Sequence, residues 1–390
     1  MASETSKALL PAGLADDLPP DADIEAEVIG ALMATFRAHG YERVKPPLIE
    51  FEESLLGGPG AALAQQIFRV MDPQSQRMLG VRADMTVQVA RIAATRLRQR
   101  ARPLRLSYSG QVLRTRGSQL RPERQFSQAG FELIGSASLE ADVEAILLAA
   151  EALRGAGATH LSIDLTLPHL VGVLAADRGI VGPRLDQLRD ALDRKDAAAL
   201  ALVAKDDPDR AFGRLLEAAG PVDDALAAIK AIALPKEVSD IVDAASALVA
   251  LARPHLGDLL LTLDPTEYRG FEYHTGISFS VFARGVRGEL GRGGRYVLEN
   301  GEPATGFSVY LDSLRRALPA RVSGGLVFVR ASAGFDRCQK LHAEGWRTVR
   351  GFDDAADAKA EAARLGCAHY FLDGSVHALN DAGHKQSGKR

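Results

Sequence analysis

Apolar side chains recur at every fourth position near the start of the chain, at Ile24, Val28, Leu32 and Phe36. This spacing places them on one face of an amphipathic helix, which we expect to end at Gly40. The next segment, residues 41–49, has strand character but contains Pro46 and Pro47, so it should lie at a sheet edge or an interface. Further helices are predicted over residues 86–100 and 138–156.

The pattern changes to a period of two over residues 125–134, which predicts a strand. One face of that strand carries Phe126, Gln128, Gly130 and Glu132. An aromatic ring, an amide and a carboxylate beside a glycine make a poor hydrophobic core face, because buried polar groups need hydrogen-bonding partners. We therefore expect this face to form the floor of a binding site. Arginines gather just before it, at Arg105, Arg114, Arg116, Arg121 and Arg124.

Residues from about 160 to 258 are rich in Ala, Leu and Asp. Helices are predicted there over residues 183–194, 196–205, 208–219 and 221–233. Three of them begin with a proline, which suits the first position of a helix. We interpret this section as a helical insertion between two halves of a sheet, and we find no chemistry in it. Strands are expected again over residues 259–263, 276–282 and 307–309, with a turn-rich glycine segment over residues 285–301.

A last section, residues 325–375, alternates strand and helix in the order β-α-β-α-β. Its predicted strands cover residues 325–329, 347–351 and 369–372, and its predicted helices cover residues 337–344 and 356–365. This order indicates a small α/β module with partly parallel strands. Residues 376–390 are expected to form a polar tail that is disordered from Asn380 onward.

Composition places the chain among globular proteins with two or three domains. It has 390 residues, of which 46% are hydrophobic and 25% are charged, and its formal net charge is −3. This charge gives no electrostatic sign of nucleic-acid binding. Two cysteines cannot form a zinc site alone, and they favour a reducing compartment. Without a targeting segment or a membrane-spanning run, a cytoplasmic protein is expected.

Three short segments carry the candidate chemistry. Asp84 and Thr86 stand at a predicted helix start, where they serve equally well as helix-capping residues. His274 taken alone is more often a satisfied core or surface histidine than a ligand-binding one. Taken together, the candidate residues indicate a binding site more strongly than any one of them does. The set comprises Asp84, Thr86, Gln128, Glu132, Arg269, Tyr273 and His274.

Together these residues contain what a free amino acid requires. A carboxylate and a hydroxyl, Asp84 and Thr86, suit an ammonium group. The planar donors of Arg269 and the amide of Gln128 suit a ligand carboxylate. Glu132, with Tyr273 or His274, can recognise a side chain that has its own donors, such as an imidazole.

The chain resembles the histidyl-tRNA synthetase family of class II aminoacyl-tRNA synthetases over about residues 10–375. The matching motifs are residues 82–86 (Arg-Ala-Asp-Met-Thr), 125–132 (Gln-Phe-Ser-Gln-Ala-Gly-Phe-Glu), 269–276 (Arg-Gly-Phe-Glu-Tyr-His-Thr-Gly) and 293–296 (Gly-Gly-Arg-Tyr). The resemblance implies an α+β fold over residues 1–320, with an antiparallel sheet flanked by helices and dimerised around Pro47. It further implies that residues 325–375 are a truncated anticodon-binding-like module.

The departures from that family affect the nucleotide site. The resemblance assigns Arg114 and Phe126 to this site, now vestigial. The glutamate that the family places two residues after the arginine is Arg116, a charge reversal. The glycine and arginine of its third motif are Tyr310 and Ser313. Loss of a fixed cation opposite a developing phosphoryl charge costs orders of magnitude in rate. ATP chemistry is therefore damaged, while the amino-acid pocket is largely kept.

This combination resembles the regulatory subunits of ATP phosphoribosyltransferase, the first enzyme of histidine biosynthesis. The resemblance implies a non-catalytic chain without metal or cofactor, required for the activity of a short catalytic subunit. It also implies a homodimer within a hetero-octamer, feedback inhibition by histidine as effector, and no tRNA binding. Two alternatives are an active histidyl-tRNA synthetase and a tRNA-independent enzyme that activates or transfers amino acids, and both are opposed by the damaged nucleotide site.

Overall fold

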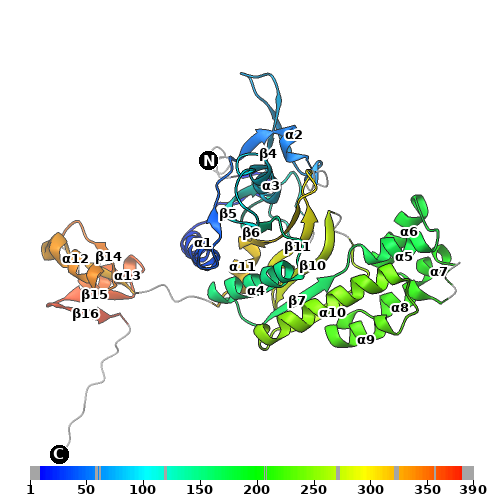
Figure 1. Ribbon diagram of the computed structural model, residues 1–390. Coiled ribbons are helices and arrows are strands. Elements are labelled where there is room, and N and C mark those ends of the chain that lie inside the picture. Colours follow the sequence, from blue (N-terminus) through cyan, green and yellow to red (C-terminus); the bar gives the residue numbers. More distant parts are fainter. Residues whose placement is uncertain are drawn as a thin grey trace, which may run out of the picture. The chain divides into compact units, whose positions relative to one another are not determined.

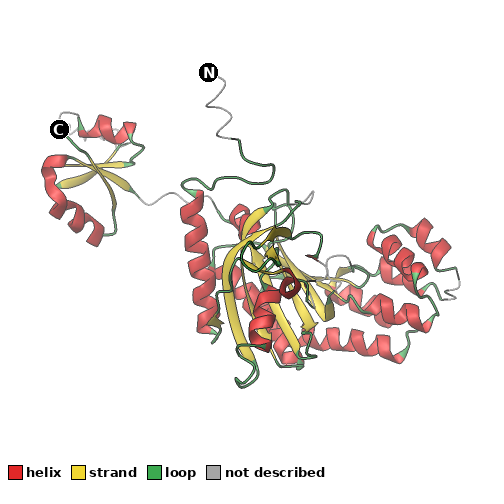
Figure 2. Ribbon diagram, turned by 90° about the horizontal axis from the view of Figure 1, so that it is seen from above, coloured by secondary structure: helices red, strands yellow, loops and turns green. Residues whose placement is uncertain are grey.

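The computed structural model contains two compact units, Met1–Pro319 and Ala320–Arg390. It describes residues 9–57, 60, 63–117, 121–205, 207, 209–268, 273–319, 325–354 and 357–379. Figures 1 and 2 show the first unit as a curved sheet with helices on its faces and a group of helices at one end. No helix in the described part of the chain combines the length and apolar character needed to cross a membrane.

A nine-stranded sheet forms the centre of the first unit. Its long antiparallel strands follow the order β5 (Leu104–Leu113), β6 (Gln125–Ile134), β12 (Pro303–Tyr310), β11 (Gly291–Val297), β10 (His274–Ala283) and β7 (Leu161–Thr166). β1 (Glu42–Arg43) pairs in parallel with β5 at one edge. Beyond β7 lie β9 (Leu260–Asp264), which is parallel to it, and β8 (Gly220–Pro221). The expected α+β fold with an antiparallel sheet is confirmed.

Helices α1 (Asp21–Ala38) and α4 (Leu139–Gly155) pack against one face of this sheet, and α10 (Lys236–Leu256) packs against α4. Phe131 of β6 lies in that core, where the Phe36 ring meets it edge-on at 5.2 Å between centroids. The opposite face is covered in part by α3 (Thr86–Ala94), which contacts β5 and β6. β6 therefore has the predicted two faces. The predicted helices at residues 24–40 and 138–156 are confirmed, whereas the helix that begins at Thr86 ends at Ala94, earlier than expected.

The strand expected over residues 41–49 is wrong as one continuous element. Only Glu42–Arg43 joins the nine-stranded sheet, while Ile49 begins β2 (Ile49–Phe51) of a separate sheet with β4 (Met78–Val81) and β3 (Phe68–Met71), beside α2 (Glu52–Leu55). Pro46 and Pro47 between them have no N–H to donate to a ladder. Their carbonyls instead accept hydrogen bonds from Arg82 Nη1 at 3.1 and 3.4 Å.

The section expected to be helical from about residue 160 begins with strand β7. Its buried Leu161, Ile163 and Leu165 alternate along the sequence, a period-two signal that the alanine-rich composition of the section obscured. The helices that follow are α5 (Leu170–Asp177), α6 (Pro183–Asp193), α7 (Ala197–Val203), α8 (Ala211–Glu217) and α9 (Val222–Lys230). Pro183 opens α6 as expected, Pro221 is the residue before α9, and Pro208 lies outside the described residues.

The prediction of a turn-rich segment over residues 285–301 is confirmed at its two ends and wrong in the middle, where β11 lies. A Cβ on Gly293 would stand 2.4 Å from the Gly306 carbonyl oxygen and 2.6 Å from the Phe279 ring. One on Gly291 would stand 2.5 Å from the Ser308 carbonyl oxygen. Gly291 and Gly293 therefore allow close packing within the sheet, whereas Gly285, Gly288 and Gly301 have positive φ in the turns on either side of β11.

The second unit has the predicted β-α-β-α-β order. It contains β13 (Leu326–Val329), a 3-10 turn (Ala331–Ala333), α12 (Gly334–Ala343), β14 (Arg347–Arg350), α13 (Ala358–Arg364) and β15 (His369–Leu372). β13 pairs in parallel with β14 and β15. The start of the expected tail is wrong, since β16 (Ser375–Ala378) forms a hairpin with β15, and residues 380–390 lie outside the described residues. Cys338 and Cys367 are buried free thiols in this unit.

We expect Gly293→Ala to lower the free energy of unfolding by roughly 1–3 kcal/mol, because the new methyl group meets backbone that cannot move without breaking the ladder. Gly213→Ala is the matched control. Its Cβ would lie 3.6 Å from the nearest side-chain atom within α8, so it should raise the free energy by about 0.5–1 kcal/mol. Urea unfolding followed by circular dichroism measures both effects, and equal midpoints for the two variants would contradict this account of β11.

Candidate functional site

The polar face of β6 lies at the centre of a buried floor that crosses several strands. Gly130 pairs in register with Tyr108 of β5 and with Ser308 of β12. A Cβ on Gly130 would lie 2.6 Å from the Tyr108 hydroxyl. One on Gly306, the register partner of Glu132, would lie 2.0 Å from its carboxylate oxygen Oε2. The two glycines therefore leave the space that the polar groups of the floor occupy.

Glu132 is the buried acid of this floor, with 1% of its surface exposed. The Tyr108 hydroxyl donates to its Oε1 at 3.1 Å, and the Tyr296 hydroxyl donates to its Oε2 at 2.9 Å. Burial raises the pKa of Glu132 to about 8, against the hydrogen bonds donated by Tyr296, Thr86 and Tyr108. Burial and the nearby Glu132 likewise raise the pKa of both tyrosines well above the ordinary value. A cationic or N–H-donating ligand beside Glu132 would favour its ionised form.

Asp84 is held beside the floor by hydrogen bonds to both of its oxygens. Oδ1 accepts from the Thr86 N–H at 2.7 Å just before α3. The N-cap residue of α3 is Met85, without a side-chain cap, so the capping alternative for Asp84 and Thr86 is wrong. Oδ2 accepts from Gln128 Nε2 at 2.8 Å. The same nitrogen donates to Ser308 Oγ at 2.8 Å, while Gln128 Oε1 accepts from the Met85 N–H at 3.0 Å. Because both amide hydrogens are used within the protein, Gln128 orients Asp84 and has none left for a ligand carboxylate.

Tyr273 connects His274 to the same floor. Its ring stacks on the His274 ring at 4.0 Å between centroids and meets the Tyr296 ring edge-on at 6.1 Å. Burial raises the pKa of Tyr273 well above its ordinary value, with a further contribution from Asp84. The structure thus gathers Asp84, Thr86, Gln128, Glu132, Tyr273 and His274, whereas Arg269 lies outside the described residues.

Sequence reasoning missed Tyr108, Ser308, Tyr296 and Arg292. Arg292 pairs in register with Ser308, and the Glu289 carboxylate accepts from its Nη2 at 2.7 Å. Burial lowers the pKa of Arg292, but Glu289, Tyr310 and Tyr273 together outweigh this effect and leave the pKa raised. Once β11 is recognised as a strand, the period of two places Arg292 and Tyr296 on the floor. The arginine of the Gly-Gly-Arg-Tyr motif, Arg295, faces the other way and binds Asp142 of α4 at 2.9 Å.

The residues assigned to a vestigial nucleotide site also lie together. The Arg114 guanidinium lies 5.1 Å from the centroid of the Phe126 ring, and the Tyr310 ring meets Phe126 edge-on at 5.9 Å. Ser313 is buried in α11 (Leu311–Ala317), where its Oγ accepts from Arg316 Nη2 at 3.1 Å. Arg316 also binds Asp312 and Glu123, so charged partners of the protein already surround it.

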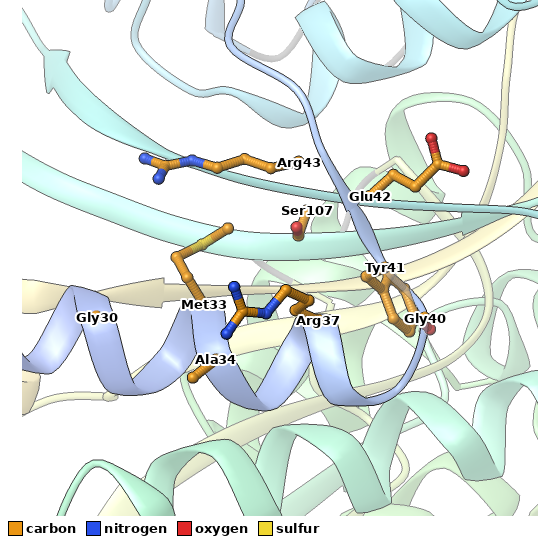
Figure 3. A pocket seen from close by; sticks show the side chains of 9 residues that line it. All are labelled: Gly30, Met33, Ala34, Arg37, Gly40, Tyr41, Glu42, Arg43 and Ser107. Atoms are coloured by element: carbon orange, nitrogen blue, oxygen red, sulfur yellow. The ribbon is translucent and has the colours of Figure 1, made fainter.

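A separate hollow of about 550 Å³ lies between α1, β1 and β5. Figure 3 shows its lining, with Met33 extending from α1 toward the strand that carries Ser107 and Arg37 running along the helix. Ser107 and Tyr108 are neighbours in β5, so their side chains point to opposite faces of the sheet. This hollow, the α1 groove, therefore lies on the other side of the sheet from the polar floor.

Comparisons with known proteins agree with this geometry. A family model described as Histidyl-tRNA synthetase matches residues 13–314. The ATP phosphoribosyltransferase regulatory subunit of Rhodospirillum centenum is 52% identical, over 96% of this chain and 97% of its own. The protein of the same name from Paramagnetospirillum magneticum is 53% identical, over 95% and 97%.

Solved structures show the same fold. The structure of an ATP phosphoribosyltransferase regulatory subunit/histidyl-tRNA synthetase from Bacillus halodurans C matches with a TM-score of 0.78 at 25% identity, covering 91% of this chain and 96% of that one. A Nostoc histidyl-tRNA synthetase, at 18% identity, has the same TM-score of 0.78 over 96% of this chain and 95% of its own, which is a likeness of fold alone. The expected class II synthetase-like fold is confirmed.

Glu132 makes the stability of the protein depend on pH. Its pKa is about 8 in the folded chain against an ordinary 4.5, so the folded state retains a proton that the unfolded chain releases. Its contribution to stability is full below pH 4.5 and is lost as the pH rises toward 8. At about 1.4 kcal/mol per pKa unit, the loss amounts to several kcal/mol.

Glu132→Gln keeps the shape of the protonated acid and removes the titration. We expect the wild-type protein to lose clearly more unfolding free energy than this variant between pH 5 and pH 8, measured by urea unfolding without ligand. Parallel losses in the two proteins would show that Glu132 is ionised throughout this range.

Proposed function

This chain belongs to the family of ATP phosphoribosyltransferase regulatory subunits, and on that premise we propose that its polar floor binds histidine as the effector of the enzyme. It is a regulatory subunit without catalysis of its own, within a fold shared with histidyl-tRNA synthetases. The observation that carries the proposal is the pairing of a deeply buried acid, Glu132, with a second carboxylate, Asp84, held in place by Gln128. A histidine zwitterion carries a cation and a ring N–H that these two groups complement.

In the proposed binding mode the ammonium group of histidine lies near Asp84 and Thr86. The imidazole ring lies near Glu132, beside the stacked rings of Tyr273 and His274. The carboxylate is assigned to Arg269 by the family resemblance. The floor supports this orientation because Asp84 lies at one end of the row of polar groups and Glu132 at the other, joined through Gln128, Ser308 and Tyr108.

We further propose that the chain forms a homodimer within a hetero-octamer that includes a short catalytic subunit in the cytoplasm, and that it does not bind tRNA. The exposed Leu48 and Ile49, next to Pro47, support self-association around this segment. The nucleotide side supports the absence of aminoacylation, because Tyr310 and Ser313 replace the glycine and arginine expected there.

Asp84→Asn should weaken histidine binding at least tenfold, since a lost charge-assisted contact in a buried site costs about 2–5 kcal/mol. Isothermal titration calorimetry with histidine measures this. Glu144→Gln is the matched control, because it neutralises a carboxylate on α4, which packs on the opposite face of the sheet, where it binds Arg105. Unchanged affinity in the Asp84 variant would show that histidine binds elsewhere.

The purified chain should show no histidine-dependent exchange of pyrophosphate into ATP. The double variant Ser313→Arg with Tyr310→Gly should remain silent as well, because Arg121 and Arg316 already approach the Ser313 hydroxyl at 3.5 and 3.1 Å and a third guanidinium would be repelled. A working histidyl-tRNA synthetase assayed in parallel is the positive control. Exchange above background by the natural chain would contradict the absence of catalysis.

Addition of this chain to the short catalytic subunit should raise the rate of phosphoribosyl-ATP formation, and histidine should inhibit the complex. Asp84→Asn should shift inhibition to at least tenfold higher histidine while leaving activation unchanged, because an effector acts only through its differential affinity for two states. Steady-state rates over a histidine titration measure both effects. Inhibition of the variant complex at the wild-type concentration would place the sensing site on another surface.

A further inference from the structure

The Arg121 side chain lies against the two rings of the nucleotide side, Phe126 and Tyr310, which meet each other edge-on. Its guanidinium carbon lies 3.7 Å from the centroid of the Tyr310 ring and 5.2 Å from that of Phe126. A guanidinium is planar and stacks on aromatic faces much as a heterocyclic ring does. Stacked rings lie with their centroids about 4.5–7 Å apart. Arg121 therefore covers the ring face on which a planar ligand would have to stack.

Charged partners hold Arg121 in this position. Its Nε lies 3.4 Å from Asp312 Oδ2, and its Nη2 lies 3.9 Å from Glu289 Oε1. Nη2 also donates to the Glu289 carbonyl oxygen and to Ser313 Oγ, at 3.5 Å each. Only 9% of Arg121 is exposed. A ligand that displaced the guanidinium would break these contacts, while Arg316 would remain beside Asp312 and Arg292 beside Glu289.

The segment before α1 ties down the loop that carries Arg121. The Gly13 carbonyl accepts from the Arg124 N–H at 2.8 Å, and the Ala12 carbonyl accepts from Arg124 Nη1 at 3.1 Å. Gly13 has a φ of +77°, and a Cβ there would lie 2.8 Å from both the Pro122 carbonyl oxygen and the Arg124 side chain. Asp17 of the same segment binds Arg315 of α11 at 2.8 Å. The segment thus joins the loop to the helix that carries Asp312.

We propose that Arg121 is a built-in cover of the aromatic pair Phe126 and Tyr310, and that it excludes purine rings from this chain. The pair keeps a ring face suited to stacking a heterocycle, but the protein covers that face with its own cation. The exclusion of nucleotide therefore has a physical cause separate from the missing arginine at Ser313. The inference concerns the nucleotide side only and does not depend on histidine binding to the polar floor.

Adenosine is the suitable probe, because it carries the purine ring without phosphates that Asp312 and Glu289 would repel. We expect the wild-type full-length chain to show no saturable adenosine binding at millimolar concentration in calorimetry. Arg121→Ala should bind adenosine at least tenfold more tightly than the wild type, and ribose should not bind to it. Arg316→Ala is the matched control, since it removes a guanidinium from the other side of Asp312 without uncovering a ring, and it should behave as the wild type does.

Arg121→Lys provides a second folded test, because it keeps the positive charge beside Asp312 and Glu289 but loses the planar group that covers Tyr310. It should also gain adenosine binding. Thermal unfolding and histidine calorimetry on the same samples report whether each variant is intact. Saturable adenosine binding by the wild type, or no gain in any intact Arg121 variant, would overturn the proposal.

Discussion

Burial of the Glu132 carboxyl in the middle of the nine-stranded sheet is the constraint on which the rest of the site depends. A buried acid is stable only with donors around it, and here they are the hydroxyls of Tyr108 and Tyr296 on neighbouring strands. Those groups need space, which Gly130 and Gly306 leave open. Because this face of the strands is given to polar groups and glycines, the hydrophobic core lies on their other face.

The polar floor and the nucleotide side differ in how their buried groups are satisfied. On the polar floor, where we propose that histidine binds, the polar groups satisfy one another in a row from Asp84 to Glu132, so the floor is stable without a ligand. On the nucleotide side, Arg121 lies against both the carboxylates and the aromatic rings. The proposed sensing of an amino acid without its activation needs only the polar floor, and in the proposed arrangement Arg121 closes the nucleotide side.

The sequence was sufficient for features that depend on local pattern. The period of four in α1 and the period of two in β6 gave those elements and the polar face of the floor, and family motifs led to most of the candidate residues. Features that depend on contacts between distant segments were missed. Nothing local distinguishes the glycines of β11 from turn glycines, because what requires them is the backbone of β12. Arg292 was missed because strand β11 was not predicted. The role of Gln128 was missed because the sequence does not show which groups accept its amide hydrogens.

The strands at the two edges of the large sheet, β1 and β8, are each two residues long, and β8 contains Pro221. Short edges and proline offer few free N–H and C=O groups, so neither edge can template another strand. Main-chain pairing is the least selective way for proteins to join, because every sequence has the same backbone. Contact between a different subunit and these two edges of the large sheet therefore relies on side-chain surfaces, where charge and shape discriminate between partners.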